Sequence, residues 1–265
     1  MRSKRAKKGQ LELVMVRDKN GQRRRGTGAG GRPAKNPERP SERHKVRAPI
    51  DRRHPQHVTL RVVEAIGRLR KWHYYRAVRQ ALFSVFDTMD FRIVHFSIQG
   101  NHLHLVCEAE NAMALASGMK RFQCSAAQRL NRAYSQRAGK KRRGSVFPDR
   151  YHARSITSVR ELRNVVSYVL NNFRHHGGYG PTLYEGRLDA FSSAIWFPGW
   201  KERTTAIVHV PRGYDPPPHV LPQTWLLNEG WKRAKPISCF EIPGIAADAR
   251  RIRRLERAAR ARASD

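Results

Sequence analysis

Paired cysteines, long apolar runs and acidic side chains are all scarce in this chain of 265 residues. Cys107, Cys124 and Cys239 stand far apart and form no CxxC pair, which excludes a disulfide framework and a cysteine-based zinc site. The sequence contains no run of 18 apolar residues, and no apolar core follows its basic N-terminus, so we expect neither a membrane span nor a secretory signal. A reducing, cytoplasmic location fits these absences.

The shortage of acidic residues leaves a large positive charge. Lys and Arg number 53 against 21 Asp and Glu, and the formal net charge is +32. The excess is spread over both ends and the centre of the chain. A folded segment with this charge repels itself unless it binds a polyanion, and nucleic acid is the usual one. We therefore expect a nucleic-acid-binding protein associated with the nucleoid, without a membrane partner.

The composition divides the chain into four parts. Residues 1–56 are rich in Arg, Lys, Gly and Pro and predict a basic, largely disordered arm. Residues 57–177 have the apolar patterns of a folded domain. Residues 178–249 are rich in Pro and Trp and are interpreted as an appended segment, which packs back on the core or binds a partner. Residues 250–265 predict a basic helix or tail.

Strand and helix patterns follow one another between residues 57 and 177. Alternating apolar residues predict strands at 58–63, 91–98, 102–108 and 151–156. Apolar residues at helical spacing predict helices at 69–89 and 112–137. Gly100-Asn101 is expected to turn tightly between the second and third strands. This order predicts an α+β fold with a ferredoxin-like antiparallel sheet and helices on one of its faces.

A third helix is expected to cover the other face of the sheet. Ser158 and Glu161 have the spacing of a capping box, and Gly177-Gly178 would end the helix. Between them, an apolar stripe consists of Leu162, Val166, Val169 and Phe173. Packing of this stripe would place the helix directly against the strands.

Two histidines in the third strand are candidate metal ligands. His102 and His104 alternate with Leu103 and Leu105, so the imidazoles project from one face and the leucines from the other. Two imidazoles on a rigid strand make half of a divalent-metal site. Such an ion would polarise a phosphodiester as a Lewis acid. Imidazole ligands favour Mn²⁺ over Mg²⁺, which prefers oxygen.

The third helix offers a candidate nucleophile. Tyr168 lies on the flank of the apolar stripe, and Asn172 follows one turn later on the same flank, so both could face the histidine pair. A tyrosine hydroxyl that attacks phosphorus forms a phosphotyrosine, which conserves the energy of the phosphodiester for rejoining. Tyr151 is a rival nucleophile, although its position in a strand beside Arg150 favours a role in DNA positioning or in the core.

At these residues the chain resembles the single-tyrosine HUH transposases, particularly the REP-associated tyrosine transposases. The matching motifs are Asn101-His102-Leu103-His104, the stretch 146–152, and the helix segment 168–172. The resemblance covers roughly residues 57–177. It implies that His102, His104 and Asn172 bind Mg²⁺ or Mn²⁺ and that Tyr168 is the nucleophile.

We therefore expect a metal-dependent DNA transposase or nickase-ligase that acts on single-stranded or hairpin DNA. Such a protein could act as a monomer or as a homodimer that exchanges its tyrosine helices. A domesticated, non-catalytic nucleic-acid binder is an alternative, and an RNA-binding basic protein of ribosomal type is another. The candidate DNA contacts are the basic residues Lys140, Lys141, Arg142, Arg143 and Arg150.

Overall fold

The computed structural model describes residues 49–176, 187–202, 207–208, 210 and 212–243. The predicted disordered arm lies almost entirely outside these residues, as do the glycines expected to end the third helix and the predicted basic tail. Within the described part of the chain, no helix combines the length and the apolar character needed to cross a membrane.

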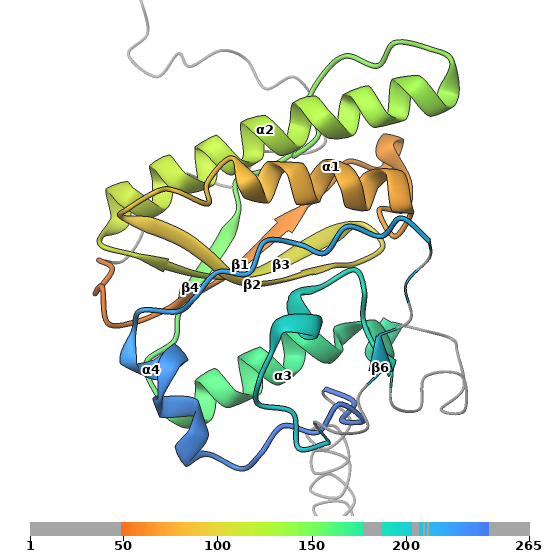
Figure 1. Ribbon diagram of the computed structural model, residues 1–265. Helices are drawn as coiled ribbons and strands as arrows, with labels where there is room; N and C mark the ends of the chain where they lie inside the picture. The colour runs from red at the N-terminus through yellow and green to blue at the C-terminus, as the bar shows by residue number, and fades with distance from the viewer. Residues whose placement is uncertain (1–48, 177–186, 203–206, 209, 211, 244–265) are drawn as a thin grey trace, which may run out of the picture. The chain divides into compact units, whose positions relative to one another are not determined.

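A four-stranded antiparallel sheet is the centre of the fold (Figure 1), and its strands lie in the order β2-β3-β1-β4. The strands are β1 (Gln56–Arg61), β2 (Phe91–Ile98), β3 (His102–Ala109) and β4 (His152–Ser155). A short turn joins β2 to β3, and the Gln99 N–H donates to the His102 carbonyl across it at 2.9 Å. This is the predicted ferredoxin-like α+β sheet, so the fold class is confirmed.

The pairing of β1 with β3 sets which side chains share a face. Leu60 is paired with Leu103, and Thr59 with His104. Paired residues of neighbouring strands point to the same side of a sheet. The leucines therefore enter one core, while Thr59 and His104 stand on the opposite face. A slip of one residue in this register would exchange the two faces.

Two helices cover the leucine face of the sheet, α1 (Trp72–Phe83) and α2 (Ala112–Ala138) (Figure 1). α2 begins at an Asn111 cap, whose side chain accepts from two backbone N–H groups, and ends at Gly139 with a φ of 63°. A Cβ at Gly118 would lie 2.2 Å from the Phe91 ring, so only glycine allows α2 this close to β2.

The predicted limits of the first helix, 69–89, are wrong at both ends. Lys71 has extended backbone angles, and the Leu69 N–H donates to the Gly100 carbonyl at 2.7 Å, so the helix can begin only at Trp72. After Phe83 the chain tightens into turns with i to i−3 hydrogen bonds. Phe86, which the predicted helix included, lies in these turns and is 43% exposed.

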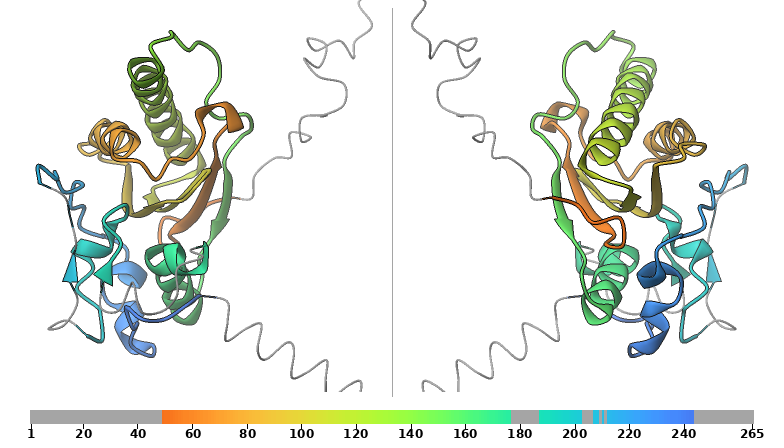
Figure 2. Two further views of the ribbon diagram at one scale, coloured as in Figure 1. Left: turned by 90° about the vertical axis from the view of Figure 1, so that its right-hand side faces the viewer. Right: turned by 90° about the vertical axis from the view of Figure 1, so that its left-hand side faces the viewer.

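The third helix, α3 (Val159–His176), packs on the other face of the sheet (Figure 2). The Ser158 hydroxyl accepts from the Glu161 N–H at 3.2 Å, and the Glu161 carboxylate accepts from the Thr157 N–H at 3.0 Å. Leu162, Val166 and Val169 of the predicted stripe form one buried cluster with Val94 and Val106 of the sheet, and Phe173 is also buried. The apolar stripe of α3 therefore packs on the apolar side chains of this sheet face.

The appended segment also packs on the α3 side of the sheet (Figure 2). Its described elements are β5 (Arg187–Leu188), η3 (Ser193–Trp196), β6 (Ile207–Val208), α4 (Trp225–Asn228) and η4 (Gly230–Arg233). Its apolar side chains complete the core beneath α3, and the buried members are Leu188, Ala194, Phe197, Trp200, Leu226, Leu227, Ile237 and Cys239. The described part of this segment therefore packs back on the core.

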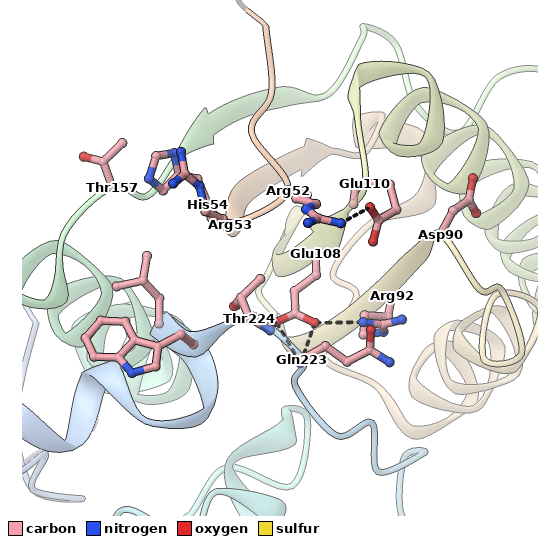
Figure 3. A pocket seen from close by; sticks show the side chains of 13 residues that line it. Arg52, Arg53, His54, Asp90, Arg92, Glu108, Glu110, Thr157, Gln223 and Thr224 are labelled. Carbon is pink, nitrogen blue, oxygen red and sulfur yellow. Dashed lines mark hydrogen bonds and ion pairs between the residues drawn. The ribbon is translucent and has the colours of Figure 1, made fainter.

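A buried carboxylate anchors the appended segment to β3 (Figure 3). The side chain of Glu108 is 4% exposed and forms an ion pair with Arg92 at 3.3 Å. It also accepts from the Gln223 N–H at 2.9 Å, and from the N–H and the hydroxyl of Thr224 at 2.7 Å each. Thr224 in turn caps α4. One side chain therefore fixes where the segment crosses the end of the sheet.

Replacing this carboxylate should destabilise the protein. Glu108→Ala leaves Arg92, whose side chain is 13% exposed, without its counter-charge and removes the acceptor of three donors, so we expect a loss of about 3 kcal/mol in the free energy of unfolding. The control is Glu110→Ala. Glu110 is half-exposed, and its ion pair with Arg52 is long, at 3.9 Å, so we expect a loss below about 1 kcal/mol. Urea denaturation measures both, and equal losses would contradict the anchoring role.

Candidate active site

The face of β3 that α3 covers presents His102 and His104. His104 is 4% exposed, whereas His102 lies nearer the edge of the site and is half-buried. Their Nε2 atoms are 3.0 Å apart, and the two rings stand almost perpendicular, at 88°. Strand alternation therefore places both imidazoles on one face, as the sequence predicts.

The surrounding hydrogen bonds orient both rings. His102 Nδ1 lies 2.8 Å from Asn101 Oδ1, and an amide oxygen can only accept, so this nitrogen carries the hydrogen. His104 Nδ1 lies 3.3 Å from the Thr59 hydroxyl and 3.2 Å from His57 Nε2. With a hydrogen on Nδ1 of each ring, the lone pair of each imidazole is on Nε2, and these two atoms are 3.0 Å apart.

His57 is a member of this site that the sequence analysis did not identify. Its ring stacks on His104, with centroids 5.3 Å apart and planes 29° apart. Burial lowers the pKa of His57 to about 4, and the positive charges of Arg154 and His152 add to this effect. A neutral imidazole can accept the hydrogen of His104 Nδ1. The alternation of β1 puts His57 and Thr59 on one face, but only strand pairing shows that this face meets His104.

Tyr168 on α3 lies against this imidazole cluster. Its ring meets His104 edge-on, with centroids 5.0 Å apart, and meets His57 in the same way at 6.0 Å. The ring is half-buried and lines an open groove. A single chain therefore brings Tyr168 to the histidine pair without help from a second subunit. Tyr151 lies elsewhere, 8% exposed in the core beneath α1 and α2.

Asn172 lies one turn beyond Tyr168 and is completely buried. Neither atom of its amide has a hydrogen-bond partner within the part of the chain that the structure describes. Arg70 connects this end of α3 to the end of β2. Its guanidinium donates to the Ile98 carbonyl at 2.8 Å and lies 6.0 Å from the ring of Phe173, the residue after Asn172. Ile98 is the partner of Leu103 in the hairpin, so Asn172 lies towards the His102 end of β3.

Gln99 contributes a second buried amide that the sequence analysis did not identify. Its Nε2 donates to the Ser97 hydroxyl at 2.5 Å, and Ser97 is paired with His104. Its Oε1 has no partner among the residues described. A buried amide without partners costs about 1–3 kcal/mol, so it calls for a water or an ion. The two-residue spacing of Ser97 and Gln99 was the sequence signal that could have placed Gln99 on the same face as His104.

These donors suit a divalent cation. Two ligands at right angles, each about 2.1 Å from an ion, lie about 3.0 Å apart, which is the separation of the two Nε2 atoms. Imidazole nitrogen and amide oxygen together suit Mn²⁺ or Mg²⁺. The described residues contain no group of three or more His, Cys, Asp and Glu that could hold a metal ion. Among the described residues, further ligands would therefore be amide oxygens, and water or a bound phosphate would supply others.

The predicted DNA-contacting residues Lys140, Lys141, Arg142 and Arg143 do not join this cluster. They lie in the segment that follows α2, across the sheet from α3 (Figure 1), whereas Arg150 lies two residues before β4. Arg142 donates to the Asn131 side chain and, at 3.1 Å, to the Ser145 carbonyl, so its guanidinium holds the loop together. The exposed members are Lys140, Lys141, Arg143 and Arg150. Their role in DNA binding stays a prediction.

Comparison with known proteins gives one family. Residues 54–172 match the model of the family described as transposase IS200 like, a range that runs from just before β1 to Asn172. Among solved structures, the chain is similar to a REP-associated tyrosine transposase bound to a REP hairpin, at 14% identity and a TM-score of 0.43. That alignment covers 67% of this chain and 98% of the other. No curated protein matches the sequence.

The lowered pKa of His57 predicts a loss of stability in acid. The unfolded chain binds a proton near the ordinary pKa of 6.5, whereas the folded chain binds it only near 4. The free energy of unfolding should therefore fall as the pH falls from 6.5 to 4, with His57 contributing at most about 3 kcal/mol.

Urea denaturation at pH 7 and pH 4.5 tests this contribution. We expect His57→Gln to have a shallower pH dependence than the wild type, because the glutamine does not titrate. His95, whose pKa burial also lowers to about 4, remains in both proteins as a common background. The same slope in the two proteins would contradict the prediction.

Proposed function

We propose that this chain, which belongs to the IS200-like transposase family through residues 54–172, is a DNA transposase that cuts and rejoins strands through a covalent phosphotyrosine. The observation that carries the proposal is the contact of the Tyr168 ring with His104 in one chain. Single-stranded or hairpin DNA is the proposed substrate, because a splayed strand lets a protein align one phosphate in a groove.

Tyr168 is the proposed nucleophile. Its Oη attacks the scissile phosphorus and forms a phosphotyrosine, while the bond from phosphorus to the leaving sugar oxygen breaks. The hydroxyl proton of Tyr168 passes to solvent, and the leaving oxygen takes up a proton as the free hydroxyl end of the strand. A strand hydroxyl that later attacks the same phosphorus restores the phosphodiester and releases Tyr168. Bond type is conserved throughout, so no ATP is required.

His102 and His104 are the proposed ligands of a divalent ion, Mn²⁺ or Mg²⁺, with Asn172 as a third. A bound ion would supply Lewis-acid polarisation of the scissile phosphate. Asn101 and Thr59 hold the two imidazoles in the orientation that exposes both Nε2 lone pairs. The buried Gln99 is a further candidate oxygen donor, because its Oε1 has no partner among the described residues. The chain's own part in the chemistry is thus to orient donors and to hold the phenol beside them.

The nucleophile has a direct test. Incubation of the wild type with a labelled hairpin DNA and Mn²⁺ should give a covalent protein–DNA adduct that survives denaturing electrophoresis. Tyr168→Phe lacks the attacking oxygen and should give none. Tyr151→Phe is the matched control and should form the adduct as the wild type does. An adduct that persists in Tyr168→Phe would remove Tyr168 from this role.

The metal ligands are tested by His104→Ala. Loss of one imidazole should reduce cleavage by at least about 10²-fold, as removal of one charge-stabilising group does in other enzymes, while DNA binding is retained. Cleavage at the wild-type rate would contradict the metal site. Binding by the wild type without metal-dependent cleavage of any DNA tried would favour the non-catalytic alternative.

His57 is proposed to position His104 for the ion. Groups that hydrogen-bond the distal nitrogen of a ligating imidazole typically change metal affinity 10- to 100-fold when mutated. We expect His57→Leu to weaken Mn²⁺ binding by this amount in calorimetry without DNA. His57→Gln should rescue part of it, since its amide oxygen can accept from Nδ1. Thr59→Val measures how much the Thr59 hydroxyl, the other group at His104 Nδ1, contributes to Mn²⁺ affinity. Unchanged affinity in His57→Leu would refute the positioning role of His57.

A further inference from the structure

A groove of about 1140 Å³ opens beside Tyr168, and its lining includes His57 of β1 and Arg154 of β4 as well as residues of α3. α3 forms one wall, and Lys201 and residues 234–243 of the appended segment line the opposite side. The second wall lies outside residues 54–172, so it belongs to the part of this chain beyond the family match.

The α3 wall leads straight to the proposed nucleophile. Arg160, Asn164 and Tyr168 follow one another at intervals of four residues and all line the groove. At 1.5 Å per residue this stripe is about 12 Å long. Arg160 and Asn164 are exposed, and Tyr168 is half-buried at the inner end. A chain-like ligand that enters at Arg160 would reach the phenol by following one helix face.

The opposite wall is fixed in place by Arg163. This side chain is 11% exposed, forms an ion pair with Glu241, and donates to the carbonyls of Lys235 and Pro236 at 3.1 and 3.0 Å. The Asn171 amide also donates to the Ser238 carbonyl at 3.0 Å. These bonds tie the wall to α3 at several points. The groove is therefore preformed and requires little ordering when a ligand binds.

The lining is cationic. Its two acidic residues are both paired, Glu161 with Arg154 at 3.0 Å and Glu241 with Arg163. Its remaining cations are Arg160, Lys201 and Lys235. These three are exposed and make no ion pair with any residue that the structure describes. An unpaired cationic groove beside a nucleophile for phosphorus matches a polyanionic strand.

We infer that this groove holds the single-stranded DNA that continues from the scissile phosphate, with its phosphates at Arg160, Lys201 and Lys235. The inference rests on the proposed function for the identity of the scissile position. Stacked nucleotides follow one another at about 3.4 Å and extended ones at longer intervals, so the 12 Å stripe spans about two to four nucleotides. Asn164, midway along the stripe, is placed to donate to or accept from a base or sugar.

The test compares two sets of three charge removals in the full chain. The groove set is Arg160→Ala, Lys201→Ala and Lys235→Ala together. The control set, Lys120→Ala, Arg121→Ala and Arg132→Ala, removes the same charge from exposed positions of α2, across the sheet. Both sets carry Tyr168→Phe, so that binding is measured without cleavage. The probe is a fluorescently labelled single-stranded DNA of mixed sequence.

The groove set should bind this DNA at least about tenfold more weakly, and the slope of log affinity against log salt should fall by about 2, as expected for three lost phosphate contacts. The control set should stay within about threefold of the parent. A further variant that keeps the charge, with Arg160→Lys, Lys201→Arg and Lys235→Arg, should bind as the parent does. Its recovery, together with matching thermal melts, excludes misfolding as the cause of a loss.

Each result separates the groove from the proposed function. Equal losses in the two sets, or no loss in the groove set, would overturn the groove. If the wild type forms the phosphotyrosine adduct while the groove set binds normally, the transposase chemistry stands and the groove falls. If no adduct forms but the groove set alone loses binding, the groove stands as a DNA-binding surface and the proposed chemistry falls.

Discussion

The antiparallel pairing of β1 with β3 is the constraint on which the site depends. It sets Thr59 opposite His104 and brings His57 within hydrogen-bonding distance of the same imidazole. Because side chains alternate along a strand, the same register also sends Leu60 and Leu103 into the core beneath α1 and α2. A slip of one residue would bury the histidines in the apolar core and expose the leucines to α3. The stability of the core therefore enforces the geometry of the imidazole cluster.

The face under α3 combines apolar packing with polar groups that lack partners. Val94, Val106 and the α3 stripe pack together, yet the Asn172 amide and the Gln99 carbonyl oxygen are buried without hydrogen bonds among the residues described. Buried polar groups without hydrogen bonds lower the stability of the fold. Their presence in a native core therefore indicates a functional role or a bound partner. Asn172 lies towards the His102 end of β3, and Gln99 follows Ser97, the partner of His104, so a water or the proposed cation would satisfy these groups.

The appended segment extends this arrangement beyond the part that matches the family. Glu108 holds its Gln223-Thr224 turn to the sheet, and Arg163 holds residues 235–241 to α3. Each anchor is a charged side chain that hydrogen-bonds backbone groups of the segment, and only Arg163 also forms an ion pair with it. Between them, the segment closes the core beneath α3 and supplies the second wall of the cationic groove. Residues inside and outside the range that matches the family model thus line one surface.

The sequence by itself determined the local features. Alternation separated His102 and His104 from the leucines, the Ser158 cap located α3, and the order of patterns indicated a ferredoxin-like sheet, because each of these depends on neighbours within a few residues. Tertiary structure decided the rest. The end of α1 at Phe83 follows from tightened turns, the roles of His57 and Gln99 follow from strand pairing, and the groove follows from residues some 70 positions apart meeting across α3. Charge alone indicated the loop 140–143 as a DNA contact. The groove that we infer for DNA depends instead on which cations lie beside Tyr168 without an ion pair among the described residues. Pairing over such distances has no local signature, since any basic residue in the chain could have occupied that wall.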